Sequence, residues 1–139
     1  MANTISFTSR LSIADDGSTY ASTATTATTV NVESTLGCAK QSAQKVGTGA
    51  FEDIDTGDVD LEEEYVLRLE NKDDTNYVEV KFFVDAGNSA VCAIMRPGEP
   101  FGPIRCPAQT AGYPKYQMQA NTAECKVEVV VGEAGDPDA

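Results

Sequence analysis

The sequence predicts an all-β protein, an antiparallel β-sandwich that is jelly-roll-like and has about eight or nine strands. Between Ile5 and Val131 the chain is a succession of short segments in which apolar and polar residues alternate, and turn-forming residues separate them at intervals of roughly ten residues. No stretch shows a convincing helical repeat of apolar residues. Two facing sheets are the simplest way to bury so many strands that are apolar on one face.

The N-terminal part of the chain is predicted to form two strands. Apolar residues recur at mostly alternating positions from Ile5 to Ile13, and the Asp-Asp-Gly sequence at 15–17 ends this strand. From Tyr20 to Val32 the chain consists almost entirely of Thr, Ala, Ser and Val, which predicts one longer strand with a solvated threonine face. A flexible linker is the alternative, because this segment lacks bulky anchoring residues.

In the middle of the chain the strand pattern is hard to recognise at first and becomes regular after Leu61. Residues Leu36 to Gly49 are predicted to be mostly loop, with a strand near Val46. Between Phe51 and Leu61, apolar residues are interleaved with acids around a Thr-Gly-Asp turn at 56–58. The remaining strands are predicted over Tyr65 to Glu70, Tyr77 to Val84, Ala90 to Arg96, Phe101 to Cys106, Tyr113 to Ala120 and Glu124 to Val131.

The strongest local signal is the dipeptide Pro97-Gly98. Proline presets φ at the second position of a type II turn and glycine supplies the positive φ at the third, so the strand from Phe101 is predicted to return along the one before it. Pro100, Pro103 and Pro107 cannot donate to a ladder, which favours an edge strand or an irregular return.

The chain is predicted to form one domain over residues 1–133, followed by a flexible acidic tail over 134–139, with exposure beginning at Gly132. The last strand has apolar side chains on one face and charged side chains on the other, which is typical of an antiparallel sheet with one face in contact with solvent. Its apolar face carries Cys125, Val127, Val129 and Val131.

Charge excludes some partners. The chain of 139 residues has a formal net charge of −12, and its ten Lys and Arg residues are scattered singly. Such a chain repels phosphate backbones and anionic lipids, so neither nucleic acid nor a membrane is an expected partner. The first residues do not resemble a signal peptide, and no apolar stretch approaches membrane-spanning length, so synthesis in the cytoplasm is expected.

Four cysteines, Cys38, Cys92, Cys106 and Cys125, could form two disulfides by number alone. Their spacing matches no zinc or redox motif, and a cytoplasmic origin favours free, half-buried thiols over disulfides. A hairpin centred on Pro97-Gly98 would place Cys92 opposite Pro103, which disfavours a bridge from Cys92 to Cys106.

The acidic stretch at 53–64 was compared with calcium-binding loops, because Asp53, Asp55 and Glu64 occupy loop positions 1, 3 and 12. Gly57 and Asp58 stand in the reverse of the required order, so a solvated acidic turn is favoured.

No enzymatic activity is expected. The chain has no histidine, and nothing in its pattern pairs carboxylates or places a base beside a cysteine. The sequence therefore predicts no catalytic, cofactor-binding or metal-binding residues, and it leaves the partner-binding residues unknown. The aromatic residues Tyr65, Tyr77, Tyr113 and Tyr116 could line a sugar-binding platform, although their positions in strands favour packing in the core or at an interface.

Three segments of the second half, taken together and in order, resemble small β-sandwich structural proteins encoded by tailed bacteriophages. The first is YVLRLENKDDTNYVEV at 65–80, the second MRPGEP at 95–100, and the third QANTAECKVEV at 119–129. The acidic run at 62–64 and the extra prolines around Phe101 depart from the family pattern. The resemblance covers roughly residues 57–133.

The resemblance implies a virion component with no catalytic residue to transfer. Within that class the expected function is a capsid decoration or cement protein that binds the outer face of the capsid lattice, after assembly in the host cytoplasm. The implied partners are the major capsid protein or other virion proteins, and further copies of the chain in an oligomer such as a trimer. A tail, neck or fibre component and a carbohydrate-binding module are the alternatives.

Overall fold

Twelve β-strands make up the regular structure of the part of the chain that the computed structural model describes, residues 3–7, 11–15, 17–21, 28–32 and 39–134. No helix occurs in those ranges. The strands are β1 (Asn3–Phe7), β2 (Ser12–Asp15), β3 (Ser18–Ala21), β4 (Thr28–Val32), β5 (Ala39–Val46), β6 (Glu52–Asp53), β7 (Tyr65–Asn71), β8 (Val78–Asp85), β9 (Asn88–Met95), β10 (Pro100–Cys106), β11 (Lys115–Ala120) and β12 (Cys125–Glu133).

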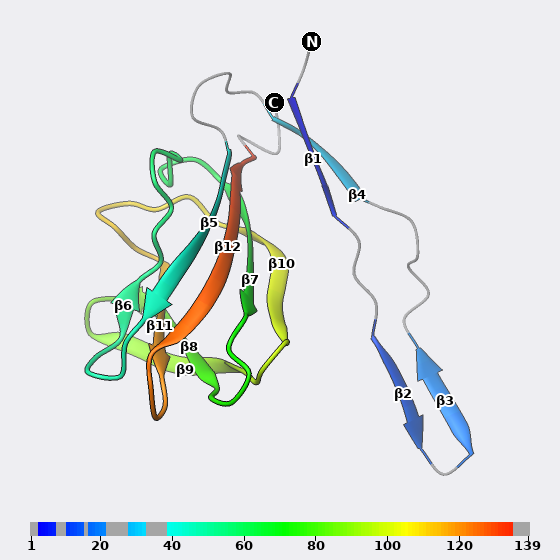
Figure 1. Ribbon diagram of the computed structural model, residues 1–139. Coiled ribbons are helices and arrows are strands. Elements are labelled where there is room, and N and C mark those ends of the chain that lie inside the picture. Colours follow the sequence, from blue (N-terminus) through cyan, green and yellow to red (C-terminus); the bar gives the residue numbers. More distant parts are fainter. Residues whose placement is uncertain (1–2, 8–10, 16, 22–27, 33–38, 135–139) are drawn as a thin grey trace.

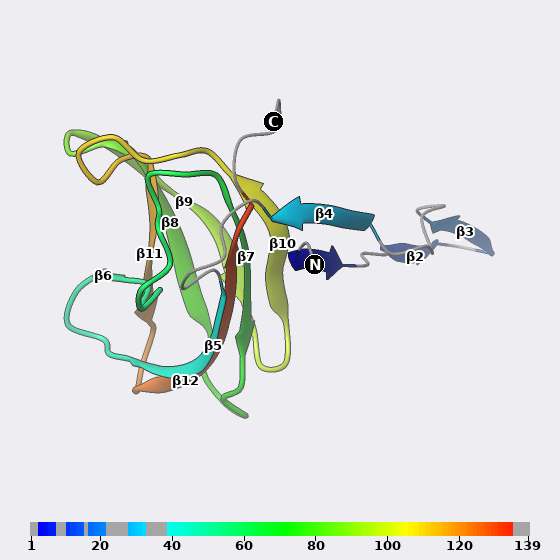
Figure 2. The ribbon, with the colours of Figure 1, turned by 90° about the horizontal axis from the view of Figure 1, so that it is seen from above.

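Strands β5 to β12 form two antiparallel four-stranded sheets, in the orders β10-β7-β12-β5 and β6-β11-β8-β9 (Figure 1). The two sheets face each other as layers (Figure 2). Strand β5 pairs with β12, β6 with β11, β7 with β10 and β8 with β9, as in one long hairpin. This hairpin is rolled so that β7 also pairs with β12 and β8 with β11, which is the jelly-roll topology. The predicted jelly-roll-like sandwich is confirmed.

The core lies between the two sheets, and alternate residues of the strands supply most of it. In β12, Val127 and Val129 are 0% exposed, whereas Lys126 between Cys125 and Val127 is exposed. Each fully buried side chain of this size contributes roughly 1.5–3 kcal/mol of hydrophobic stabilisation. The other buried members of the core cluster are Val46, Val59, Tyr65, Leu67, Leu69, Val78, Val80, Met95, Cys106, Met118, Ala120, Cys125 and Val131.

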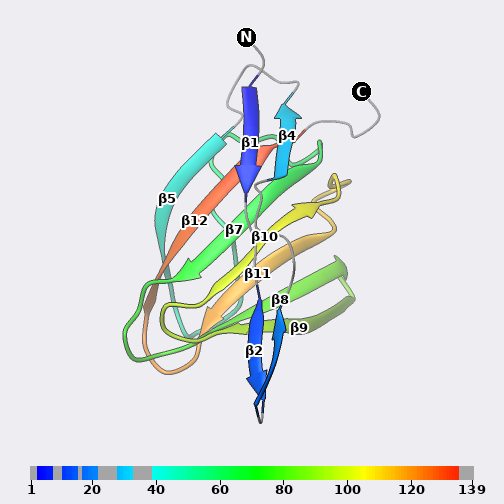
Figure 3. The same ribbon diagram turned by 90° about the vertical axis from the view of Figure 1, so that its right-hand side faces the viewer.

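The first four strands form an arm outside the sandwich. Strand β1 pairs with β4 and β2 with β3, in a register that runs from Asn3 opposite Val32 to Asp15 opposite Ser18. This arm, defined as β1 to β4, stands off from the sheet that contains β10 (Figures 1 and 2), and Figure 3 shows it from its own side, in front of the sheets. The strand predicted from Ile5 to Ile13 is divided into β1 and β2, and the strand predicted from Tyr20 to Val32 is divided into β3 and β4. Residues 8–10 and 22–27, between these pieces, lie outside the described ranges.

Strand β5 corrects the prediction that residues 36–49 are mostly loop. It spans Ala39–Val46 and pairs with β12 along its whole length. The side chains of Ser42 and Gln44 face inward but are only half buried, so its sequence lacks the apolar face that identifies a strand. Between Phe51 and Leu61, by contrast, β6 is the only strand and has two residues.

The turn at Pro97-Gly98 is confirmed, but the predicted hairpin is wrong. Gly98 has φ +81°, and the Glu99 amide donates to the Arg96 carbonyl at 2.9 Å, as a type II turn requires. Strand β10 then pairs with β7 in the other sheet instead of returning along β9. The reason is that the amide of Gly98 donates to the carbonyl of Asn71 at 2.9 Å, and the amide of Asn71 donates to Glu99 at 3.1 Å. The turn is therefore tied to the end of β7.

Strand β10 is an edge strand with an irregular register between Phe101 and Ile104, as its prolines predict.

The three segments that carry the phage resemblance meet at one end of the sandwich, the lower end in Figure 1. The buried side chain of Asn71 donates from Nδ2 to the carbonyls of Asn76 and Met95, both at 2.9 Å. The side chain of Asn121 accepts from the amide of Tyr77 at 2.9 Å. Each segment is thus held to another by an asparagine side chain or a backbone bond.

The C-terminal boundary also differs from the prediction of exposure from Gly132. Strand β12 continues to Glu133, and Gly132, Glu133 and Ala134 are buried. The amide of Ala134 donates to the carbonyl of Glu64 at 2.7 Å, which fixes this end of the chain beside the start of β7. Residues 135–139, the rest of the predicted tail, lie outside the described ranges.

Candidate functional site

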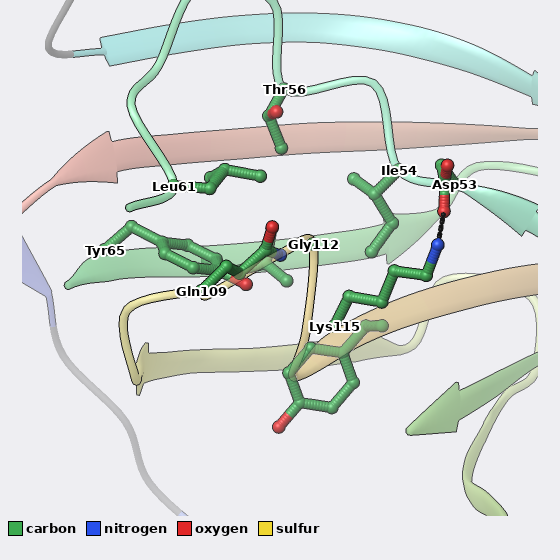
Figure 4. Close-up of a pocket in the computed structure, with 10 residues that line it drawn as sticks. Asp53, Ile54, Thr56, Leu61, Tyr65, Gln109, Gly112 and Lys115 are labelled. Carbon is green, nitrogen blue, oxygen red and sulfur yellow. Dashed lines mark ion pairs between the residues drawn. The ribbon is translucent and has the colours of Figure 1, made fainter. Parts of the chain in front are cut away.

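A cavity of about 260 Å³ opens beside the start of β7, at the opposite end of that strand from Asn71 (Figure 4). Its walls come from the loop after β6, from β7, and from the segment that leads from β10 into β11. The lining residues are Asp53, Ile54, Thr56, Leu61, Tyr65, Leu67, Gln109, Gly112, Lys115 and Tyr116.

An ion pair forms one side of the cavity. The Nζ of Lys115 lies 2.9 Å from Oδ1 of Asp53 (Figure 4). The Nε2 of Gln117 donates to the same oxygen at 2.9 Å. The hydrogen bond from Gln117 and then the one from Lys115 lower the pKa of the Asp53 carboxyl. Asp53 therefore stays ionised and paired at neutral pH, and it is not suited to act as a general base.

Buried groups at the back of the cavity remain protonated. Tyr65 is 3% exposed, and burial raises the pKa of its hydroxyl, which also shares a hydrogen bond with Gln109. Burial likewise raises the pKa of the neighbouring Cys106 thiol to about 12 and that of Tyr116 to about 12. None of the three supplies a thiolate or phenolate at neutral pH.

A tight hairpin shapes the loop that carries Gln109 and Lys115. Thr110 and Tyr113 exchange two backbone hydrogen bonds, at 2.8 and 3.2 Å. The two residues between them, Ala111 and Gly112, have φ values of +55° and +85°, as a type I′ turn requires. The amide of Gln109 donates to the carbonyl of Leu61 at 2.7 Å, which joins this loop to the one after β6.

The cavity combines apolar and polar surface. Its volume lies just below the range of about 300–1,000 Å³ that is usual for small-molecule sites. Leu61 and Tyr116 offer apolar surface, whereas Gln109 and the Asp53–Lys115 pair offer hydrogen bonds.

The acidic residues that were compared with a calcium loop do not converge. Asp53 pairs with Lys115, Asp55 pairs with Lys40 at 2.7 Å, and Glu64 pairs with Arg105 at 2.7 Å. Within the described ranges no group of three or more Cys, Asp or Glu residues is arranged to hold a metal ion. Each of these three carboxylates is paired with its own cation.

The four tyrosines do not form one platform. Tyr65 and Tyr116 line the cavity, and Tyr116 packs against Phe82 and Phe101 with ring centroids 4.9 and 5.2 Å away. The other two lie elsewhere. Tyr113 lies beside Phe83 and Lys115, and Tyr77 lies under the guanidinium of Arg96 at 5.6 Å.

Among the described cysteines, Cys92, Cys106 and Cys125 are free thiols, as the sequence predicts. Cys92 is exposed on β9, and the other two are buried. Cys38 lies outside the described ranges.

A second candidate site was missed by the sequence analysis. Strand β9 and the adjoining end of β8 expose the apolar side chains of Val84, Val91 and Ile94 to 59%, 45% and 52%. The signal was present, because the sequence NSAVCAIM at 88–95 has neither a charged residue nor a polar face. It was interpreted as an ordinary strand because the pairing partners on its two sides were not known.

Comparison of the whole sequence with models of known families, with curated proteins and with solved structures finds no match. Nor does the described part of the chain contain a helix with the length and apolar character needed to cross a membrane.

Proposed function

We propose that this chain is a structural subunit of a bacteriophage virion, specifically a capsid decoration protein that binds the outer face of the capsid lattice. The sequence resemblance in residues 57–133 supports the phage assignment. The jelly-roll sandwich supports it at the level of fold alone, since this architecture recurs in viral capsid domains but also in lectins.

The observation that carries the proposal is the combination of a closed sandwich with an arm of two strand pairs that stands off from it (Figures 1 and 2). A sandwich tied together at its Asn71 end by backbone bonds and by the Asn71 side chain gives a rigid body. An arm outside that body can reach a neighbouring subunit. Weak contacts of this kind, repeated over a symmetric shell, add up through multivalency.

The charge of the chain agrees with a location on the outside of the capsid. At a formal net charge of −12 the subunit is repelled by packaged DNA, and electrostatics therefore favours the outer surface over the interior. The same charge keeps unassembled copies soluble at high concentration.

Immunogold labelling of phage particles tests the proposal directly. Particles from a lysate that contains this chain are purified on a density gradient, analysed by mass spectrometry and labelled with an antibody against the purified protein. Label spread over the head supports decoration. Label confined to the tail or neck identifies a tail component instead, and the absence of the chain from purified particles overturns both assignments.

The cavity beside Tyr65 favours a second candidate function, a carbohydrate-binding module. Binding of the full chain to a glycan array, abolished by Gln109→Ala and retained in Gln119→Ala, would support it. Gln119 is the matched control because it donates to the carbonyl of Thr48 away from the cavity. An array without signal removes the second candidate and leaves the first untouched.

A further inference from the structure

The sandwich has four edge strands, and three of them carry features that discourage pairing with another chain. Strand β10 contains Pro100 and Pro103 and has an irregular register. Strand β5 presents the exposed side chain of Lys45, and β6 has only two residues. Prolines, lysines, bulges and short length are the usual means by which proteins protect a sheet edge.

Strand β9, the fourth edge, lacks most of this protection. It has eight residues, none of them charged and none of them proline. Its ladder with β8 has two irregularities, because β9 has an extra residue at Cys92 and β8 has one at Val84. Val91 and Ile94 are 45% and 52% exposed. A depression of about 440 Å³ lies along the first part of β9 and the adjoining end of β8. The depression is lined by Phe82, Val84, Gly87, Asn88, Ser89, Ala90 and Cys92. An edge of this kind is a template for an added strand.

The arm has the complementary property, because it needs a partner. A two-stranded ribbon alone in water is marginally stable at best, and a third strand or a packed face is required to support it. In the described ranges β1 pairs only with β4 and β2 only with β3, so each arm strand has an unpaired edge. The segments NTISF and TTVNV, which form β1 and β4, contain no charged residue.

Charge favours contact between these particular segments. Two copies of a chain with a net charge of −12 repel each other over most of their surfaces. Contact costs least where neither partner carries charge, and β9, β1 and β4 are all uncharged strands. The arm of one copy is not placed to reach β9 of the same copy, because it stands beyond the sheet that contains β10 while β9 belongs to the other sheet (Figures 2 and 3).

From these observations we propose that the β1–β4 ribbon of one copy adds to the β9 edge of a second copy. The addition forms main-chain hydrogen bonds along β9, covers Val91 and Ile94, and gives the ribbon the further strands that it lacks. When each copy gives its arm and receives another, the assembly closes as a symmetric oligomer. This interface concerns copies of the chain alone and holds whether or not the assembly is a virion.

Sedimentation velocity of the full chain tests the proposal with three single variants. Ile94→Lys places a charge on the β9 edge and is expected to weaken self-association at least about tenfold. Val30→Pro interrupts β4 in the arm and has the same expected effect. Val130→Lys is the matched control, since Val130 is also an exposed strand residue, at 37%, but lies on β12 in the middle of the other sheet. It should associate like the unmodified chain.

Mixing the two interface variants separates arm exchange from direct β9-to-β9 pairing. The Ile94→Lys copy keeps its arm and the Val30→Pro copy keeps its edge, so a mixture of the two should form a complex that neither forms alone. The proposal is overturned if the unmodified chain stays monomeric up to about 100 μM, a concentration at which even weak specific interfaces associate. It is also overturned if Val30→Pro associates normally, or if the mixture gives no complex. Circular dichroism confirms that each variant keeps its β-structure.

Discussion

The side-chain amide of Asn71 donates a hydrogen bond to the carbonyl oxygen of Met95 at 2.9 Å, and so joins the end of β7 to the end of β9 in the opposite sheet. Asn71 is 0% exposed, although it is polar. A buried amide is retained at such a position only when its hydrogen bonds are satisfied. Here its oxygen also accepts from the amide of Asp73 at 2.9 Å, so one side chain holds a turn and two sheets together.

We expect Asn71→Ala to destabilise the protein by about 3 kcal/mol, because it leaves the carbonyls of Met95 and Asn76 without their buried donor. Urea denaturation measures the change. The control is Asn121→Ala, which removes an exposed acceptor for the amide of Tyr77 and should cost about 1 kcal/mol. Equal losses in the two variants would contradict the central role of Asn71.

Gly102 provides a second comparison of stability. It has φ +86°, and a Cβ there would lie 2.5 Å from the carbonyl oxygen of Leu67 on the neighbouring strand. Gly102→Ala should therefore cost more than about 2 kcal/mol, from backbone strain together with a steric clash. Gly112→Ala shares the strain at φ +85° but meets nothing within 4 Å, so it should cost about 1 kcal/mol. If both variants lose the same stability, the close approach at Gly102 is unimportant.

Acid should destabilise the protein through Asp73. Its carboxylate accepts from the amides of Asn76 at 2.6 Å and Thr75 at 3.0 Å, and these bonds lower its pKa in the folded state below the ordinary 3.8. A lowered folded-state pKa adds stability above pH 3.8, and this stability is lost as the pH falls further. We expect Asp73→Asn to be less stable at neutral pH and to lose less stability on acidification. Urea midpoints between about pH 6 and 2 test this, and parallel curves for the two proteins would refute it.

At alkaline pH we expect the protein to lose stability through the ionisation of Cys106. Burial raises the pKa of its thiol from an ordinary 9.0 to about 12, so the folded state keeps a proton that the unfolded chain releases near pH 9. Stability from this group is complete below pH 9 and falls as the pH rises toward 12. In Cys106→Ala the free energy of unfolding should fall less between pH 8.5 and 10.5 than in the unmodified chain, as measured by urea titration. An unchanged slope would show that the thiol is solvated.

Alternation of apolar and polar residues was enough to predict the fold class and most of the sandwich strands. It succeeds for β12, whose Val127 and Val129 are buried, and for β7, whose Leu67 and Leu69 face the core. It fails for β5, because this edge strand is held by its ladder with β12 and has Ser42 and Gln44 on its inner face.

The prediction that β10 returns along β9 failed for a different reason. Pro97-Gly98 predicts the type of turn correctly, but a turn does not determine which strands pair on either side of it. The partner of β10 is set by bonds between Asn71 and residues 98 and 99, which are distant in the sequence. The candidate sites were unpredictable for the same reason, since both the cavity beside Tyr65 and the unprotected β9 edge arise from segments that only the tertiary fold brings together.

The pairing of β5 with β12, β6 with β11, β7 with β10 and β8 with β9 bears on the order in which the chain can assemble. Once the short connection between Asp85 and Asn88 has closed, each outer ladder has only a small additional loop to bring together. We therefore expect folding to begin in the middle of the chain and to proceed outward, ladder by ladder. The strand joined to the arm would then be among the last to dock, which would leave the arm mobile until the body that carries it is complete.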